Sequence, residues 1–197
     1  MFMITNERII IHSMSDYYTG RGDGGMSFVG LKKINKTDLV MDALGDLDEL
    51  NSLLGYIKST LKGANKKRFF NIIADIQENI FIVQAQVASH MFEKQYVPPH
   101  FAKEKVSDAE RMIAQFEKLF VPTKKFIVPG TNELSARFDH ARAIARRAER
   151  SVLRFSKKQK LDPDISAYLN RLSSLLFVMA RVVAHKKGVS EKAPRYR

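Results

Sequence analysis

The longest regular pattern in this 197-residue sequence lies between about Lys66 and Lys94. Apolar side chains recur there at steps of three and four residues, which places them on one stripe of a helix. A continuous 3-4 seam of this kind has to be covered by other helices, so it indicates the core of a helical bundle and not a cofactor-binding face. The seam consists of Ile73, Ile76, Ile80, Val83 and Val87.

Four further helices are predicted from apolar spacing and from start and stop signals. One runs from about Asp38 to Lys62. Ser107 followed by Glu110 has the spacing of a capping box and predicts a helix that ends near residue 120. Thr131 is expected to cap a fourth helix, and Asp162-Pro163 to start a last one that reaches about residue 187. Five helices with no convincing strand and no internal repeat predict an all-α bundle in a single domain.

Composition narrows the possible partners and chemistries. The chain is 45% hydrophobic and carries a formal charge of +12, which favours nucleic acid, anionic membranes or nucleotide phosphates as partners. It contains no cysteine, which excludes disulfides, thiolate metal sites and thiol nucleophiles. The N-terminal segment has no signal-peptide pattern, and no segment approaches the length of a membrane span, so we expect the cytoplasm.

The segment from Phe126 to Arg150 combines a short apolar approach with an arginine-rich helix. A turn of about 100° per residue puts Arg142, Arg146 and Glu149 on one stripe, beside a stripe of small apolar residues. Two interpretations stay open on this pattern alone. The stripe is either a solvated face with one intrahelical ion pair, or a row of charges at the edge of a packed interface, where each charge needs a partner.

Residues 18–30 contain five glycines, between Gly20 and Gly30, and Lys32, Lys33 and Lys36 follow them. Such a segment can wrap its backbone N–H groups around phosphate oxygens, but it can equally be a flexible loop. It matches neither the Walker motif nor the dinucleotide-binding fingerprint.

The spacing of the histidines in the sequence indicates neither a metal site nor a catalytic histidine. A di-iron bundle needs Glu-x-x-His pairs, and none of the five histidines lies in one. We therefore predict no protein-bound metal site, and no Ser/His/Asp arrangement.

Four stretches resemble one family in the family's own order, from about Tyr18 to Gly188. They are YTGRGDGG, ALGDLDELNSLLG, FIVPG followed by ARAIARRAER, and YLNRLSSLLFVMAR. The sequence is similar to the ATP:cob(I)alamin adenosyltransferases of the propanediol-utilisation type. The resemblance implies a five-helix bundle assembled as a homotrimer, with active sites between subunits.

The resemblance also implies a reaction and a division of the chain. Co(I) of a reduced corrinoid would attack the 5′ carbon of ATP, giving adenosylcobalamin and triphosphate, with Mg²⁺ accompanying ATP. Residues 1–37 would form a phosphate-binding segment, 38–188 the bundle and 189–197 a C-terminal tail. A corrinoid reductase and an adenosylcobalamin-dependent mutase are possible protein partners.

Site residues follow from the resemblance, position by position. Phe126 matches the aromatic that closes the lower face of the corrin, and Asp48 and Arg142 match a salt bridge across the subunit interface. Arg146 and Glu149 match positions in the catalytic centre that also bind ATP. The remaining ATP-binding candidates are Thr19, Gly20, Arg21, Gly22, Asp23, Gly25, Lys36 and Asn170.

Three departures from the family pattern affect the ATP site. Arg21 stands where the family usually has threonine, Ser174 stands where it usually has aspartate, and the usual C-terminal tryptophan is missing. A non-catalytic nucleotide- or corrinoid-binding trimer is therefore an alternative. A basic helical nucleic-acid-binding protein is a weaker one, since no groove of interleaved aromatic and basic residues is evident.

Overall fold

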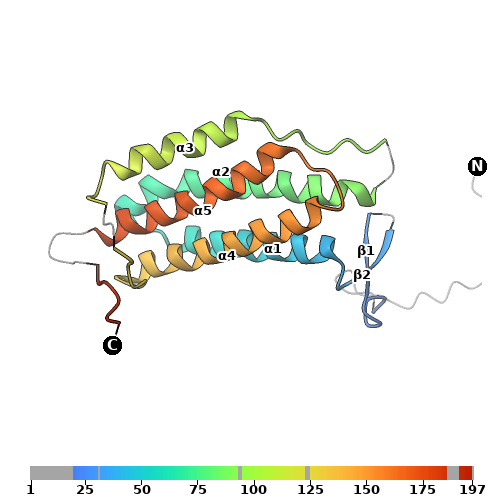
Figure 1. The fold of residues 1–197 in the computed structure, drawn as a ribbon, viewed down its shortest axis with the longest axis horizontal. Helices are drawn as coiled ribbons and strands as arrows, with labels where there is room; N and C mark the ends of the chain where they lie inside the picture. The colour runs from blue at the N-terminus through green and yellow to red at the C-terminus, as the bar shows by residue number, and fades with distance from the viewer. Residues whose placement is uncertain (1–19, 31, 93–94, 123–124, 186–190, 197) are drawn as a thin grey trace, which may run out of the picture.

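The computed structural model describes residues 20–30, 32–92, 95–122, 125–185 and 191–196. Within these residues it contains the helices α1 (Leu39–Thr60), α2 (Gly63–Ala88), α3 (Glu104–Glu117), α4 (Glu133–Ser156) and α5 (Pro163–Ala184). α4 packs against both α5 and α1, α1 against α2, and α3 against α5, so the helices run side by side along the long axis (Figure 1). The predicted five-helix bundle is confirmed.

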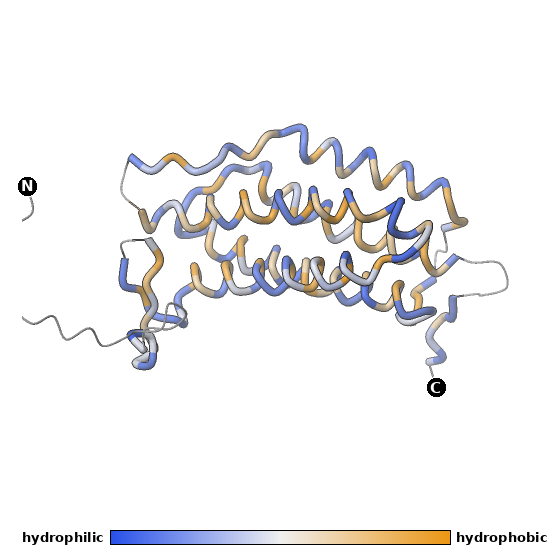
Figure 2. The backbone as a smooth tube through the Cα atoms, turned by 180° about the vertical axis from the view of Figure 1, so that it is seen from behind, coloured by the Kyte–Doolittle hydropathy of each residue, from blue (hydrophilic) through white to orange (hydrophobic). Residues whose placement is uncertain are grey.

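The five helices share one hydrophobic core. Phe69 of α2 is fully buried, and its ring centroid lies 5.8 Å from that of Phe116 on α3 and 5.4 Å from that of Phe138 on α4. Burying a side chain of this size contributes about 1.5–3 kcal/mol. Hydrophobic and hydrophilic stretches alternate along the helices (Figure 2), as expected where one face of each helix packs inward. The buried residues include the whole predicted seam, Ile73, Ile76, Ile80, Val83 and Val87.

Helix boundaries were predicted best where a side chain caps the backbone. The Asp38 carboxylate accepts a hydrogen bond from the Val40 N–H at the start of α1, and Asp162 precedes Pro163 at the start of α5 as predicted. The predicted α2 is wrong at its start, since the helix begins at Gly63, and a 3₁₀ turn (η1, Ser89–Met91) follows its end. The last helix ends at Ala184 and not near residue 187.

Two predicted caps are wrong. α3 begins at Glu104, so Ser107 lies inside the helix, where its hydroxyl donates to the Glu104 carbonyl. The cap of α4 is Asn132 and not Thr131, because Asn132 forms a capping box with Ser135.

The expectation of no strand is also wrong. β1 (Met26–Val29) and β2 (Lys32–Asn35) form an antiparallel hairpin at the end of the bundle where α1 begins (Figure 1). Gly30 at its tip has φ +58°, and an added Cβ there would lie only 2.8 Å from the Met91 carbonyl oxygen. Lys32 Nζ donates to the His90 carbonyl at 2.8 Å. The hairpin follows the glycine-rich residues 20–25 in the chain and is held against η1 by these contacts.

One element contradicts the expectation about membrane spans. Within the described residues, α5 is 22 residues long and apolar enough to cross a membrane by length and composition. However, 67% of its most apolar window is buried inside the bundle. The packing of α5 against α3 and α4 accounts for that apolar composition.

Candidate functional site

The arginine helix enters the bundle through a fixed turn. Gly130 adopts φ +100°, a conformation that favours glycine, and the next residues lead into the α4 cap. The Asn132 side chain accepts from the Ser135 N–H and donates to the Val183 carbonyl of α5, both at 3.0 Å. The start of α4 is therefore fastened to the end of α5.

The charged stripe of α4 lies along the edge of its contact with α5. Ala141, Ala145 and Ala148 are buried, and the neighbouring Arg146 is exposed. Glu149 forms no ion pair with an arginine of its own helix in the described chain; its Oε1 accepts a hydrogen bond of 3.0 Å from Asn170 Nδ2 on α5. The interpretation as charges at a packed edge is thus the better one, and the intrahelical ion pair is wrong.

A hollow of about 300 Å³ lies among α3, α4 and α5. Arg142 and Arg146 contribute two guanidinium groups to it, and Ser174 contributes a hydroxyl. The guanidinium of Arg142 lies 5.5 Å from the centre of the Phe177 ring, within cation–π range. Two cations beside an aromatic wall suit an anionic ligand that also carries an apolar part. The other lining residues are Ile113, Glu117, Ser173 and Val178.

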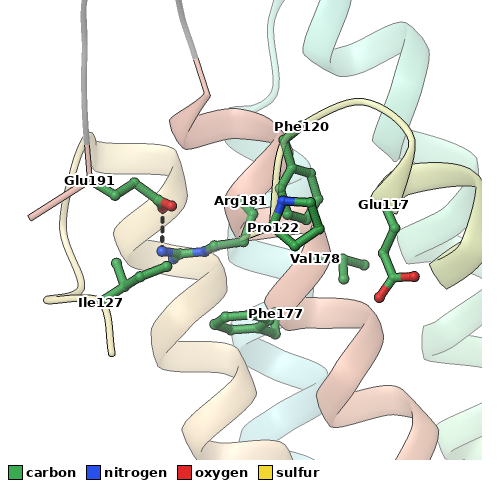
Figure 3. A pocket seen from close by; sticks show the side chains of 8 residues that line it. All are labelled: Glu117, Phe120, Pro122, Ile127, Phe177, Val178, Arg181 and Glu191. Atoms are coloured by element: carbon green, nitrogen blue, oxygen red, sulfur yellow. Dashed lines mark hydrogen bonds and ion pairs between the residues drawn. The ribbon is translucent and has the colours of Figure 1, made fainter. Parts of the chain in front are cut away.

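A second hollow of about 90 Å³ adjoins the first and shares Glu117, Phe177 and Val178 with it. Figure 3 shows Phe120 and Pro122 among the side chains that line it, and the Arg181 guanidinium pointing toward the Glu191 carboxylate. Ile127, which follows Phe126 in sequence, also lines it. This hollow therefore extends the arginine-lined one toward the FIVPG segment.

The glycine-rich segment forms a compact exposed loop. The Asp23 N–H donates to the Gly20 carbonyl and the Gly25 N–H to that of Gly22, both at 3.2 Å. The Lys36 N–H donates to the Gly25 carbonyl at 2.9 Å, and a Cβ added at Gly22 would lie 3.1 Å from Lys36 Nζ. The predicted loop and its lysine thus come together, with the ammonium over the loop backbone. Arg21 is exposed on the same loop, and Thr19 lies outside the described residues.

The predicted site residues fall into two groups within one chain. Lys36 and the glycine loop lie just before the start of α1. Arg146 and Glu149 lie on α4, and Asn170 lies on α5. Among the described residues, no hydrogen bond or ion pair joins Lys36 to Arg146, Glu149 or Asn170. Asp48 and Arg142 likewise form no ion pair with each other in the described chain, and the Asp48 carboxylate is exposed. Phe126 is 80% exposed.

A buried ion cluster was missed by the sequence analysis. Arg181 is only 2% exposed; its Nη2 donates to Asp139 Oδ2 at 2.5 Å and its Nη1 donates to Glu191 Oε1. Burial raises the pKa of the Asp139 carboxyl, although Arg181 and Arg142 lower it. Burial also raises the pKa of Glu191, against the lowering effect of Arg181. Arg181 follows Asn170 by eleven positions, which puts both on one stripe of a helix, whereas nothing in the sequence pointed to Glu191.

No group of three or more histidine or acidic residues that could hold a metal ion occurs in the described residues. The site offers the guanidinium groups of Arg142 and Arg146, the Ser174 hydroxyl and the Asn170 amide, beside the carboxylates of Glu117 and Glu149. Guanidinium, amide and hydroxyl groups can bind phosphates and a nucleoside.

The fold and the site define an all-α bundle with a basic, aromatic-lined hollow among α3, α4 and α5. The sequence profile of the cobalamin adenosyltransferase family matches residues 17–183. The chain belongs to this family.

Several characterised relatives agree with that assignment. The chain is 32% identical to the corrinoid adenosyltransferase of Bacillus subtilis, over 88% of this chain and 89% of the relative. It is 33% identical to the mouse corrinoid adenosyltransferase MMAB, over 89% and 75% of the two chains. It is 31% identical to the corrinoid adenosyltransferase PduO of Citrobacter freundii, over 91% of this chain, and spans about half (54%) of that protein.

Solved structures share the fold. A variant of the PduO-type ATP:corrinoid adenosyltransferase from Lactobacillus reuteri, complexed with cobalamin and ATP, superimposes with a TM-score of 0.83. It is 27% identical, over 91% of this chain and 96% of that chain. A second variant of the same enzyme, complexed with ATP, gives 0.80 at 28% identity.

Proposed function

We propose that this protein transfers the 5′-deoxyadenosyl group of ATP to the Co(I) of a reduced corrinoid, giving adenosylcobalamin and triphosphate. The observation that carries the proposal is the hollow in which Arg142, Arg146 and Ser174 meet, with the Glu149–Asn170 pair between the same two helices. The relatives that bind ATP and cobalamin share this fold.

The corrinoid supplies the nucleophile, so the protein itself contributes little covalent chemistry to this reaction. An electron pair on Co(I) forms the bond to the 5′ carbon while the bond from that carbon to the triphosphate oxygen breaks. The protein has to hold the two substrates in line, exclude water and stabilise the charge that develops on the leaving group. In the proposed site, Arg146 and Lys36 stabilise that charge and Phe126 covers the lower face of the corrin.

Mg²⁺ would be held mainly by the phosphates of ATP and by water, the usual arrangement for this ion. That mode needs no cage of protein carboxylates.

The separation of the two groups of residues supports a site shared between copies. Lys36 with its loop would come from one subunit, and Arg146 with Asn170 from the next. We infer a homotrimer in which Asp48 of one subunit pairs with Arg142 of its neighbour, which would give the exposed Asp48 carboxylate a partner. A cytoplasmic location, a corrinoid reductase and a receiving mutase stay predictions from the sequence.

The direct experiment mixes protein, ATP and chemically reduced cobalamin and follows the absorbance. Decay of the Co(I) bands with appearance of the Co–C product supports the proposal. Binding of ATP and corrinoid without product would favour the non-catalytic trimer, and binding of nucleic acid alone would favour the third interpretation.

A further inference from the structure

The C-terminal residues 191–196 lie beside the FIVPG segment, although more than 60 positions separate the two in sequence. The Val128 N–H donates to the Lys192 carbonyl at 2.8 Å. One residue earlier, Glu191 turns inward and meets Arg181 (Figure 3). The C-terminal segment is therefore attached at two adjacent residues, once through its backbone and once through a charge.

The other end of the FIVPG segment lies beside the same cluster. The Gly130 backbone is near enough to lower the pKa of Asp139, and the Asp139 carboxylate accepts a hydrogen bond from Arg181 at 2.5 Å. The neighbouring groups thus form a ring that runs from Gly130 past Asp139, Arg181 and Glu191 to the C-terminal segment, and from there back to Val128. Phe126 lies two residues outside this ring.

A single buried guanidinium connects the two carboxylates of the ring. Arg181 is 2% exposed, and its Nε is buried without a hydrogen-bond partner among the described residues. Its guanidinium also lies 5.0 Å from the centre of the Phe177 ring. A buried cation is costly unless it is paired, so the position of Arg181 depends on both carboxylates. The ion pair between Arg181 and Asp139 joins α5 to α4. The ion pair between Arg181 and Glu191 attaches the C-terminal segment to α5.

The ring borders the hollow of about 90 Å³ that continues the arginine-lined site. Ile127 forms part of its wall, and Arg181 and Glu191 line it as well. A change in the position of residues 126–128 would therefore change both the shape of this hollow and the place of the Phe126 ring.

We propose that Arg181 is a positioning residue which, through Glu191, fastens the C-terminal segment across the FIVPG segment and so fixes where Phe126 meets the corrinoid. This proposal rests on the proposed function, because it assigns the corrinoid to that side of the site. It predicts that loosening the C-terminal segment weakens the binding of corrinoid and leaves the binding of ATP unchanged.

The test uses Glu191→Gln in the full chain, which keeps the size of the side chain and removes its charge. Arg195→Ala is the matched control, since Arg195 is exposed in the same segment and takes no part in the ring. Three quantities are compared: the exchange rate of the Val128 amide, the Kd for cob(II)alamin from its absorbance change with ATP present, and the Kd for ATP. None of them requires turnover.

For Glu191→Gln we expect the Val128 amide to exchange about tenfold faster and the Kd for cob(II)alamin to rise about fivefold or more, because the variant loses the charge that pairs with Arg181. The Kd for ATP should stay within twofold, and Arg195→Ala should behave as the wild type. An unchanged Val128 exchange rate would overturn the attachment, and an unchanged Kd for cob(II)alamin would overturn its role at the corrinoid. If the wild type makes no adenosylcobalamin, the proposed function fails, while these measurements still decide the proposal through binding.

Discussion

The Asn170 amide on α5 donates a 3.0 Å hydrogen bond to the Glu149 carboxylate on α4. Asn170 also accepts at 2.8 Å from Arg171, whose Nε donates to Glu110 on α3, again at 2.8 Å. A chain of polar contacts thus crosses three helices on an exposed surface. Exposed contacts of this kind contribute little to stability.

The first prediction concerns Asn170→Ala. We expect the Kd for ATP to rise about tenfold or more, because the variant loses an amide and leaves Glu149 without its partner. The melting temperature should change by less than about 3 °C. Calorimetric titration with ATP measures the first effect.

Glu110→Gln is the control for this prediction, since it weakens the other end of the same chain of contacts. Its Kd for ATP should equal that of the wild type. Equal losses in Asn170→Ala and Glu110→Gln would show that the contacts only support the helices.

The second prediction concerns Phe126→Ala. Phe126 is 80% exposed in the single chain, so we expect the free energy of unfolding to change by less than about 0.5 kcal/mol. Turnover with cob(II)alamin and a reductant should fall much more than the affinity for ATP, because the ring is proposed to cover the corrin and lies outside the phosphate site. Val121→Ala, at an equally exposed position (83%), is the control. Parallel losses of ATP affinity and turnover in Phe126→Ala would contradict the assignment.

The third prediction concerns the departures at Arg21 and Ser174. Relative to the family pattern, the two departures together add two positive charges, which act on the ATP site if both positions line it; Ser174 shares its hollow with Arg142 and Arg146. We therefore expect ATP binding to depend less on Mg²⁺ and to fall more steeply with salt than in the double variant Arg21→Thr, Ser174→Asp.

Titration of ATP with and without Mg²⁺, at two ionic strengths, measures both dependences. Identical behaviour of the two proteins would mean that neither position reaches the phosphates. Turnover that rises from near zero in the double variant would instead identify Ser174 as the mark of a decayed site.

The fourth prediction concerns pH and Asp139. Burial raises the pKa of Asp139 above its ordinary value of 3.8, so the folded protein holds this proton more tightly than the unfolded chain does. The stabilisation is fully present below the unfolded-state pKa and is lost as pH rises through the folded-state pKa. Asp139→Asn keeps a neutral group at every pH. From about pH 4 upward, the free energy of unfolding of the wild type should therefore decline relative to that of the variant.

Urea unfolding at several pH values gives this difference. Asp108→Asn, at an exposed position on α3, is the control and should run parallel to the wild type. A wild type that gains stability over Asp139→Asn as pH rises would contradict the direction of the shift.

The sequence predicted those parts of the fold that depend on residues close together in the chain. The seam of α2 and the Asp162-Pro163 start of α5 depend on neighbouring residues, and both are confirmed. Thr131 and Asn132 are both good capping residues, and Asn132 is the one that caps α4. Its side chain also donates a hydrogen bond to the Val183 carbonyl on α5. Such a tertiary contact leaves no periodic signal.

The same reasoning applies to the hairpin and to the ion cluster. The strands of the hairpin have four residues each, too few for a clear alternation, and they are held by contacts with η1 such as that from Lys32 to the His90 carbonyl. Glu191 and Arg181 meet through a tertiary contact, which leaves no periodic signal in the sequence. The candidate ATP residues came from the resemblance, and the structure brings Glu149 to Asn170 and Lys36 to Gly22 without joining the two pairs in one chain.

The central claim is that the ATP site is built from Lys36 of one copy and Arg146 of another. The most direct test co-assembles Lys36→Ala chains with Arg146→Ala chains, after sedimentation has shown about three chains per particle. Each variant alone should have almost no adenosyltransfer activity. In the mixture, random assembly leaves both residues intact at about a quarter of the interfaces of a cyclic trimer, so about a quarter of the wild-type rate should return. A mixture that stays as inactive as its two components would contradict the account.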